Sequence, residues 1–345
     1  MRRVIGVAGT AKNTGKTTTL QAVAAYLRSL GKPILLTSIG YDGEDLDTVT
    51  GLPKPKIPVA EGDFVATALP LMEASSVRFR WAEYAGVDCA LGPVYFGMAG
   101  GQGIVVLAGP ARADDLEKLI GAVPSALTVL LDGAFSRLAP MSVASHMVLA
   151  TGAARHREPS LLAAEIEAVA TVMAVKAADA EPQERAGLSF SEGLYVEGAD
   201  VRLFEAVRSA GQRTVYVEGP VNPHLVRSVL RMLARSGRRI DLIFRHPVDM
   251  LLSGDFLEWP EVLREAEASG HRVLSARSSR LLGFTLNPYL PELDAGTGRY
   301  TPSILPARWF LDSVRSVART PCTDIVLEGP GTLEEWLRQV VCCNH

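Results

Sequence analysis

The chain has 345 residues, of which 48% are apolar, and a formal net charge of −3 at pH 7. This length and apolar content can supply two hydrophobic cores, so we expect two domains. A slightly negative charge offers no net attraction to nucleic acid or to an anionic membrane surface, and it argues against both as partners.

The four cysteines include no C-x-x-C pair, which argues against a zinc site or a disulfide scaffold and favours a reducing cytoplasm. Cys342 and Cys343 are adjacent near the C-terminus, and their role is open. We expect no secretory signal, because Lys12 and Lys16 interrupt the apolar start. The uncharged run 89–111 holds six glycines and two prolines, so it predicts buried strands and turns rather than a membrane span. We predict a cytoplasmic protein.

The first forty residues have the pattern of a βαβ unit. Residues 4–8 form a continuous apolar run, typical of a strand that is buried on both faces. Leu20, Val23 and Leu27 then lie on one stripe of a helix that Gly31 ends. Residues 33–39 predict the next strand.

The remaining elements continue an α/β alternation in both halves of the chain. In the first half we expect strands at 77–81, 103–109, 126–132 and 146–152, helices at 113–123 and 161–178, and a loop at 40–62. In the second half we expect strands at 214–219, 241–244, near 273, at 282–286 and at 324–329, and helices at 222–236, 259–269, 308–318 and up to about 341.

A linker at 177–187 separates the two halves. We therefore predict a nucleotide-binding domain over 1–178 and a second α/β domain over 186–345 that faces a partner. No lysine follows Lys176, so the second half cannot hold another Gly-Lys-Thr loop.

The stretch "GTAKNTGKTT" at 9–18 predicts a phosphate-binding loop between the first strand and the first helix. Gly15 lets the backbone approach phosphate oxygens, and the amides of 13–17 point inward at a helix N-terminus. Lys16 can reach the β and γ phosphates, where we also give it a catalytic role, and the Thr17 hydroxyl can bind Mg²⁺. Lys12 is either a solvated loop lysine or an accessory phosphate contact. The residues expected to bind the nucleotide in this loop are Gly9, Thr10, Asn13, Thr14, Gly15, Lys16, Thr17 and Thr18.

A magnesium site also needs an acid at the end of a neighbouring strand. Asp132 ends the apolar run "ALTVLLD" and is the first candidate, with Asp42 as its rival. An acid of the loop "GYDGEDLD" can order the attacking water, and we name Asp45 for this catalytic role. The alternative for this segment is an exposed acidic loop without a catalytic function. The guanine-reading Asn-Lys-x-Asp motif is absent, which favours ATP over GTP.

The phosphate loop resembles that of dethiobiotin synthetase and its relatives among the SIMIBI P-loop proteins, because Gly-Thr precedes Gly-Lys-Thr by four residues. The resemblance implies a P-loop NTPase fold, a parallel sheet flanked by helices. It also implies that Asn287, in "LLGFTLNPYLP", reads the adenine edge, although an Asn-Pro turn is the alternative. The chain departs from that family where its catalytic Lys-Pro should end the second strand. Lys32 and Pro33 precede that strand instead.

Four further stretches, "SIGYDGEDLDTVTGLPKPK", "LDGAFSR", "VLATGAA" and "GFTLNP", resemble the KamB-type subunit of lysine 5,6-aminomutase reactivase. This resemblance implies an ATPase that works with a partner ATPase subunit and opens an adenosylcobalamin-dependent aminomutase to exchange damaged cobalamin. The alternative is an ATP-dependent small-molecule ligase of the dethiobiotin synthetase type.

Overall fold

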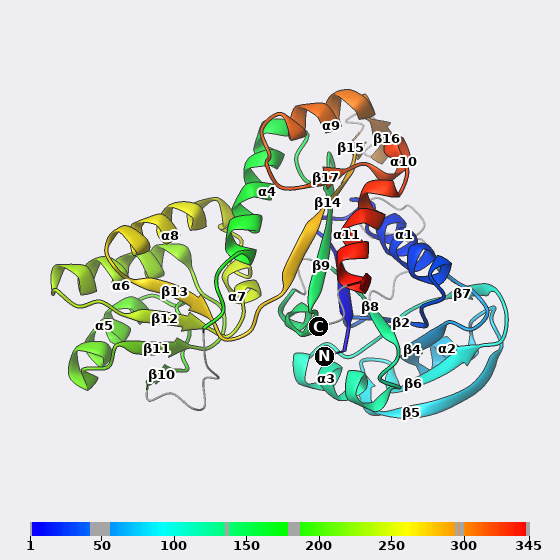
Figure 1. The fold of residues 1–345 in the computed structure, drawn as a ribbon, viewed down its shortest axis with the longest axis horizontal. Coiled ribbons are helices and arrows are strands. Elements are labelled where there is room, and N and C mark those ends of the chain that lie inside the picture. The colour runs from blue at the N-terminus through cyan, green and yellow to red at the C-terminus, as the bar shows by residue number, and fades with distance from the viewer. Residues whose placement is uncertain are drawn as a thin grey trace. The chain divides into compact units, whose positions relative to one another are not determined.

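The computed structural model describes residues 2–41, 56–134, 138–178, 187–293, 296 and 300–342. The chain divides into two compact units (Figure 1). Unit 1 combines Met1–Ala163 with Leu282–His345, and unit 2 is Ala164–Leu281.

A nine-stranded sheet forms the centre of unit 1, in the order β17-β14-β9-β1-β8-β2-β4-β6-β5. Its strands are β1 Val4–Gly9, β2 Ile34–Ser38, β4 Phe64–Ala68, β5 Phe79–Cys89, β6 Gly92–Ala99, β8 Thr128–Ala134, β9 His146–Gly152, β14 Arg280–Asn287 and β17 Cys322–Thr323. The pairs that join β1 to β8 and β9, and β2 to β4 and β8, are parallel. At one end of the sheet, β6 is antiparallel to β4, and the edge strand β5 is antiparallel to β6.

Two long helices cover one face of this sheet. They are α1 (Lys16–Ser29) and α11 (Gly331–Cys342). The apolar stripe Leu20, Val23 and Leu27 of α1 joins Trp336 of α11 and the buried strand residues in one core. Every residue of β1 and β2 is buried, which explains why β1 is apolar throughout and why β2 is apolar up to Leu36. The predicted α/β class, a mostly parallel sheet flanked by helices with a second α/β unit, is confirmed.

The other elements of unit 1 are short. They are the strand pairs β3 (Ile57–Val59) with β7 (Gly103–Val105) and β15 (Tyr289–Leu293) with β16 (Tyr300–Ile304), the helices α2 (Leu69–Glu73), α3 (Ala113–Ala122), α9 (Ala307–Arg315) and α10 (Ile325–Glu328), and a 3₁₀ helix at Ala139–Val143. The strand expected at 103–109 therefore ends at Val105. Helix α4 (Pro159–Met173) leads from unit 1 into unit 2.

The C-terminal segment corrects the predicted domain boundary. Strand β14 lies beside β9, and β17 pairs with β14 in parallel. Residues 282–345 therefore complete the sheet that begins at Val4 instead of belonging to the second domain. Local sequence patterns could not reveal this, because a strand or a helix has the same apolar pattern whichever sheet it joins.

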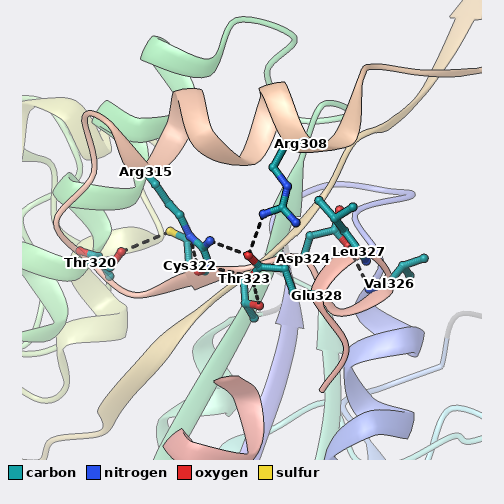
Figure 2. A network of polar contacts seen from close by, with 9 residues as sticks. All are labelled: Arg308, Arg315, Thr320, Cys322, Thr323, Asp324, Val326, Leu327 and Glu328. Atoms are coloured by element: carbon teal, nitrogen blue, oxygen red, sulfur yellow. Dashed lines mark hydrogen bonds and ion pairs between the residues drawn. The ribbon is translucent and has the colours of Figure 1, made fainter. Parts of the chain in front are cut away.

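The strand expected at 324–329 is a second correction. Asp324 is buried, and its carboxylate accepts hydrogen bonds from the backbone N–H groups of Val326 and Leu327, which starts the short helix α10. Figure 2 shows Glu328, at the end of α10, held by the guanidinium groups of Arg308 and Arg315. An N-cap therefore overrides the apolar run that predicts a strand.

Unit 2 has a four-stranded parallel sheet in sequence order, β10-β11-β12-β13. The elements are β10 Leu188–Phe190, α5 Ala199–Ala210, β11 Thr214–Val217, α6 Pro223–Arg235, β12 Asp241–Phe244, α7 Pro247–Leu251, a 3₁₀ helix at Phe256–Glu258, α8 Trp259–Ala268 and β13 Arg272–Ser275. Right-handed crossovers between successive strands place α5, α6 and α8 on the same face, and these helices contact one another in order. Asn222 caps α6, since its side chain accepts a hydrogen bond from the N–H of His224.

Across the described residues, we find no helix with the length and hydropathy that a bilayer crossing requires.

Candidate nucleotide site

The loop between β1 and α1 has the backbone of an anion-binding nest. Asn13 (φ 64°) and Gly15 (φ 84°) are both left-handed, and Lys16 is the first residue of α1. Alternation of such residues with right-handed ones turns successive N–H groups toward one point. No side chain among the described residues caps the N-terminus of α1, so its first N–H groups remain available to a ligand.

The loop is tightly folded on itself at Gly9. A Cβ atom on Gly9 would lie 2.9 Å from the Thr14 hydroxyl oxygen and 3.3 Å from the carbonyl oxygen of Ala11. Thr14 is buried, and its hydroxyl donates to the same Ala11 carbonyl at 3.0 Å. The glycine displaced from the common Gly-x4-Gly-Lys-Thr spacing therefore has a role within the loop, where a larger residue would not fit.

Strand β9 holds the start of the loop. The N–H of Thr10 donates to the carbonyl of Ala150 at 2.9 Å, and its hydroxyl donates to the hydroxyl of Thr151 at 2.7 Å. Both threonines are buried, so these bonds are protected from water.

Strand β14 holds the end of the loop through Asn287. Its amide nitrogen donates to the carbonyl oxygen of Asn13 at 2.8 Å, and its amide oxygen accepts from the N–H of Tyr289 at 3.2 Å. The side chain also packs against Gly15, where a Cβ would lie 3.4 Å from that of Asn287. Asn287 thus lies at the phosphate loop, and its contact with the adenine edge stays a prediction.

Asp132 and Lys16 face each other across the site. The Lys16 ammonium lies 2.8 Å from a carboxylate oxygen of Asp132, with exposed side-chain fractions of 27% and 15%. Strand β8 carries Asp132 between β1 and β2, level with Val7 and Ser38. The sheet therefore brings the predicted acid to the predicted lysine at the carboxyl ends of its strands, where ligands of open α/β sheets bind.

The threonines that follow Lys16 divide by burial. Thr17 is half-buried and Thr18 is exposed. Thr19 is buried; its hydroxyl donates to the carbonyl of Gly15 at 3.1 Å and lies 2.6 Å from the hydroxyl of Thr285 on β14. Thr17 thus remains the threonine suited to a metal ion, and Thr19 ties the helix to the sheet.

The donor set fits Mg²⁺ better than a metal held by the protein alone. The described residues contain no group of three or more His, Cys, Asp or Glu side chains that could hold a metal ion. Mg²⁺ commonly binds one or two protein oxygens and completes its shell with phosphate and water. Thr17 and Asp132 match this need. Asp42 and Asp45 lie outside the described residues, so their assignments stay predictions.

The end of β2 carries no lysine. Thr37 and Ser38 end this strand, and both are buried. The Ser38 hydroxyl donates to the carbonyl of Gly40 at 2.9 Å, and the N–H of Ile39 donates to the carbonyl of Asp132 at 2.8 Å. These two hydrogen bonds hold the end of β2 beside Asp132.

Sequence reasoning missed Thr151 and Thr285, which support the loop from β9 and β14. They lie in the stretches "VLATGAA" and "GFTLNP", at the end of apolar strands, but nothing in these stretches assigns either threonine to the loop. Only the strand order places them beside the phosphate loop.

Unit 1 is an α/β unit in which the strand, nest and helix have the arrangement typical of a phosphate-binding loop, with Lys16 and Asp132 at this candidate site. No protein-family model matches the chain, and no curated protein matches it either. The MinC:MinD cell division protein complex from Aquifex aeolicus includes a chain with a TM-score of 0.29 and 13% sequence identity, over 99% of this chain and 97% of that chain. The class therefore rests on the geometry of the loop.

Proposed function

We propose that the chain binds and hydrolyses ATP with Mg²⁺ at the 9–18 loop. The observation that carries this proposal is the position of Lys16, which begins α1 directly after the left-handed Gly15 and faces Asp132. Anions are stabilised at such a helix start by the unpaired N–H groups and by the helix dipole. The first turn of α1 holds no acid that would oppose them.

Each residue has a defined task in this proposal. The amides of 13–17 bind the phosphate oxygens, Lys16 neutralises charge on the β and γ phosphates, and Thr17 and Asp132 hold the metal. Bound Mg²⁺ would withdraw charge from the transferred phosphoryl group. Asp45, or another acid of 42–47, would orient the attacking water.

Nucleotide titration of the purified protein tests this proposal. We expect micromolar to millimolar binding of ATP, preferred over GTP, and a loss of hydrolysis in Lys16→Ala. The affinity should fall by about 1.5–3 kcal/mol, the usual worth of a charge-assisted contact. Lys118→Ala is the matched control, since Lys118 forms a similar ion pair, 2.9 Å from Asp115, on the exposed surface of α3. Failure of both nucleotides to bind at millimolar concentration would refute the proposal.

We further propose that the nucleotide cycle drives a partner protein, an adenosylcobalamin-dependent aminomutase, together with a partner ATPase subunit. The resemblance to KamB-type reactivase subunits supports this choice. The buried Thr37 and Ser38, which stand where a ligase of the dethiobiotin synthetase type carries its lysine, weigh against the alternative. Coupling requires that the partner binds one nucleotide state more tightly than the other, because equal affinities shift no population.

Reactivation of damaged mutase is the direct test. Inactivated mutase should regain activity when it receives this protein, its partner subunit, ATP and fresh adenosylcobalamin, and Lys16→Ala should abolish the recovery. The basal ATPase rate should rise when mutase is added. An ATPase that responds only to a small carboxylic or amino substrate, and not to mutase, would establish the ligase alternative.

A further inference from the structure

Three successive helix-to-strand turns of unit 2 share the sequence Gly-x-Arg. They are Gly211-Gln212-Arg213, Gly237-Arg238-Arg239 and Gly270-His271-Arg272. The three glycines have nearly the same left-handed φ, 70°, 72° and 75°, and each lies at the C-terminal end of a helix. The turns precede β11, β12 and β13, which are neighbours in the four-stranded parallel sheet. They therefore lie side by side at the N-terminal ends of these strands, a region that we call the amino edge.

The arginines at this edge differ in their ion pairing. In the third turn, Arg272 forms a two-pronged ion pair with Asp241 of the neighbouring strand. In the first two turns, Arg213 and Arg239 are exposed and have no carboxylate partner among the described residues. Since the same turn permits a pair in one case, turn geometry does not explain the lack of partners in the other two.

Three more arginines gather near these turns. Arg208 lies in the last turn of α5 and Arg235 is the last residue of α6. Arg238 donates to the carbonyls of Val207 and Arg208 at 3.2 and 3.1 Å. Positive charge at helix C-termini is favourable for the helix itself, which accounts for Arg238. We call Arg208, Arg213, Arg235, Arg238 and Arg239 the amino-edge arginines; the described part of the chain gives none of them an ion pair.

Elsewhere in unit 2 the helix surfaces follow the opposite pattern. Arg227 of α6 lies between glutamates of the α8 region, 3.2 Å from Glu258 and 3.1 Å from Glu261, and Arg231 pairs with Glu265 at 2.9 Å. Arg227 and Arg231 on the helix faces are therefore paired with glutamates, whereas the amino-edge arginines have no ion pair among the described residues.

The amino edge is also hollowed. A shallow hollow of about 280 Å³ lies between the first two turns and is lined by Arg213, Arg238 and Arg239, with Gln212 and the buried Ile240. Gly211 and Gly237 also line the hollow, and because they have no side chain they leave it open on both sides. A ligand in this hollow would meet guanidinium groups from two neighbouring strands, which are spaced about 4.8 Å apart.

We propose that the amino edge of unit 2 docks an acidic segment of a partner protein. Guanidinium groups bind carboxylates through two parallel hydrogen bonds, so the carboxylates of an acidic peptide can pair with arginines of both turns. A nucleic acid fits less well, because no aromatic ring lines the hollow for base stacking and the whole chain is negatively charged. The surface involves no residue of the nucleotide site, so this inference stands apart from the proposed ATPase.

A peptide-binding measurement without nucleotide tests it. The probe is a fluorescein-labelled peptide of about 12 residues that alternates glutamate with serine, observed by fluorescence anisotropy with the full chain; its affinity should fall at least tenfold between about 50 and 300 mM NaCl. The double variant Arg213→Ser/Arg239→Ser should weaken binding about tenfold or more. The control Arg264→Ser/Lys176→Ser removes two exposed charges elsewhere in unit 2 and should change binding less than about twofold.

Several results would overturn the proposal. They are no binding of the glutamate peptide at low salt, equal binding of a peptide with glutamine in place of glutamate, or equal losses in the two double variants. Tighter binding of a single-stranded DNA of the same length through Arg213 and Arg239 would identify a nucleic-acid surface instead. The salt and glutamine comparisons use the unaltered protein, so they decide the matter even if a variant does not fold.

Discussion

Lys16 and Asp132 form an ion pair in the candidate nucleotide site, with 2.8 Å between the ammonium nitrogen and a carboxylate oxygen. The lysine that we propose to bind phosphate and the acid that we propose to bind the metal therefore pair with each other when no ligand lies between them. A polyphosphate with its metal would give each group a new partner of opposite charge, so the two side chains can separate without leaving a charge unpaired. The first prediction follows from this relationship.

Asp132→Asn should abolish the dependence of nucleotide affinity on Mg²⁺ while the fold survives. The amide keeps the shape of the carboxylate and can still accept a hydrogen bond from Lys16, but it lacks the charge that Mg²⁺ requires. We expect a loss of about 1.5–3 kcal/mol in Mg²⁺-dependent ATP affinity, measured by titration with and without the metal. Asp115→Asn, an acid on the outer surface of α3, serves as the control. If Asp132→Asn has no effect and Asp42→Asn removes hydrolysis, Asp42 is the metal ligand.

Asn287→Ala should weaken ATP and GTP to a similar degree. The amide of Asn287 donates to the carbonyl of Asn13, so its removal loosens the loop that binds the phosphates common to both nucleotides. One neutral hydrogen bond is worth about 1 kcal/mol, which corresponds to roughly a fivefold loss of affinity. A loss confined to ATP would show instead that Asn287 reads the adenine edge. Asn222→Ala, which removes the cap of α6 in unit 2, should leave both affinities unchanged.

Gly152→Ala should destabilise the protein, because the added methyl group would overlap the carbonyl oxygen of Asn287. The N–H of Ala153 donates to that same carbonyl at 2.9 Å, so the backbone of β14 cannot move away without losing this bond. We expect a loss of about 1–3 kcal/mol in the free energy of unfolding, measured with urea. Gly121→Ala in α3 meets no atom within 4 Å and should stabilise its helix by up to about 1 kcal/mol. Equal effects of the two substitutions would contradict the close approach of β9 and β14.

Local patterns predicted the parts of the site that lie close together in the sequence. The apolar run 4–8, the stripe on α1, and the lysine between them predict strand, loop and helix, and β1 and α1 form where expected. Asp132 also lies where a parallel sheet should bring it, because an apolar run that ends in an acid places that acid at the carboxyl end of a buried strand.

Features that depend on strand order could not be predicted in this way. The sequence of residues 280–287 does not indicate that this strand lies next to β9, because any buried strand has the same apolar pattern. The contacts of Thr285 with Thr19 and of Asn287 with Asn13 follow from that pairing. The Gly-x-Arg turns are visible in the sequence, but whether their arginines pair with acids depends on the neighbouring strand.

The last prediction concerns His246 of unit 2, a fully buried side chain after β12. Its Nδ1 accepts a hydrogen bond from the N–H of Val248 at 3.1 Å, so that nitrogen carries no proton, and its Nε2 lies 2.9 Å from the Ser279 hydroxyl. Burial, together with the positive charges of Arg245 and Arg277, lowers the pKa of His246 to about 4. The imidazole of His246 is therefore neutral in the folded state.

Acid should destabilise unit 2 through this histidine. The unfolded chain takes up a proton below a pKa of about 6.5 and the folded chain only near 4, so stability is complete above pH 6.5 and falls between these values. The difference of about 2.5 units corresponds to about 3 kcal/mol. Burial raises the pKa of the neighbouring Asp249, which opposes part of this loss. Urea unfolding of unit 2, followed by the fluorescence of the buried Trp259, should show this slope for the wild type and lose it in His246→Asn, which keeps an acceptor for Val248. His224→Asn, at an exposed position, should keep the slope; an unchanged slope in His246→Asn would assign the acid sensitivity to another group.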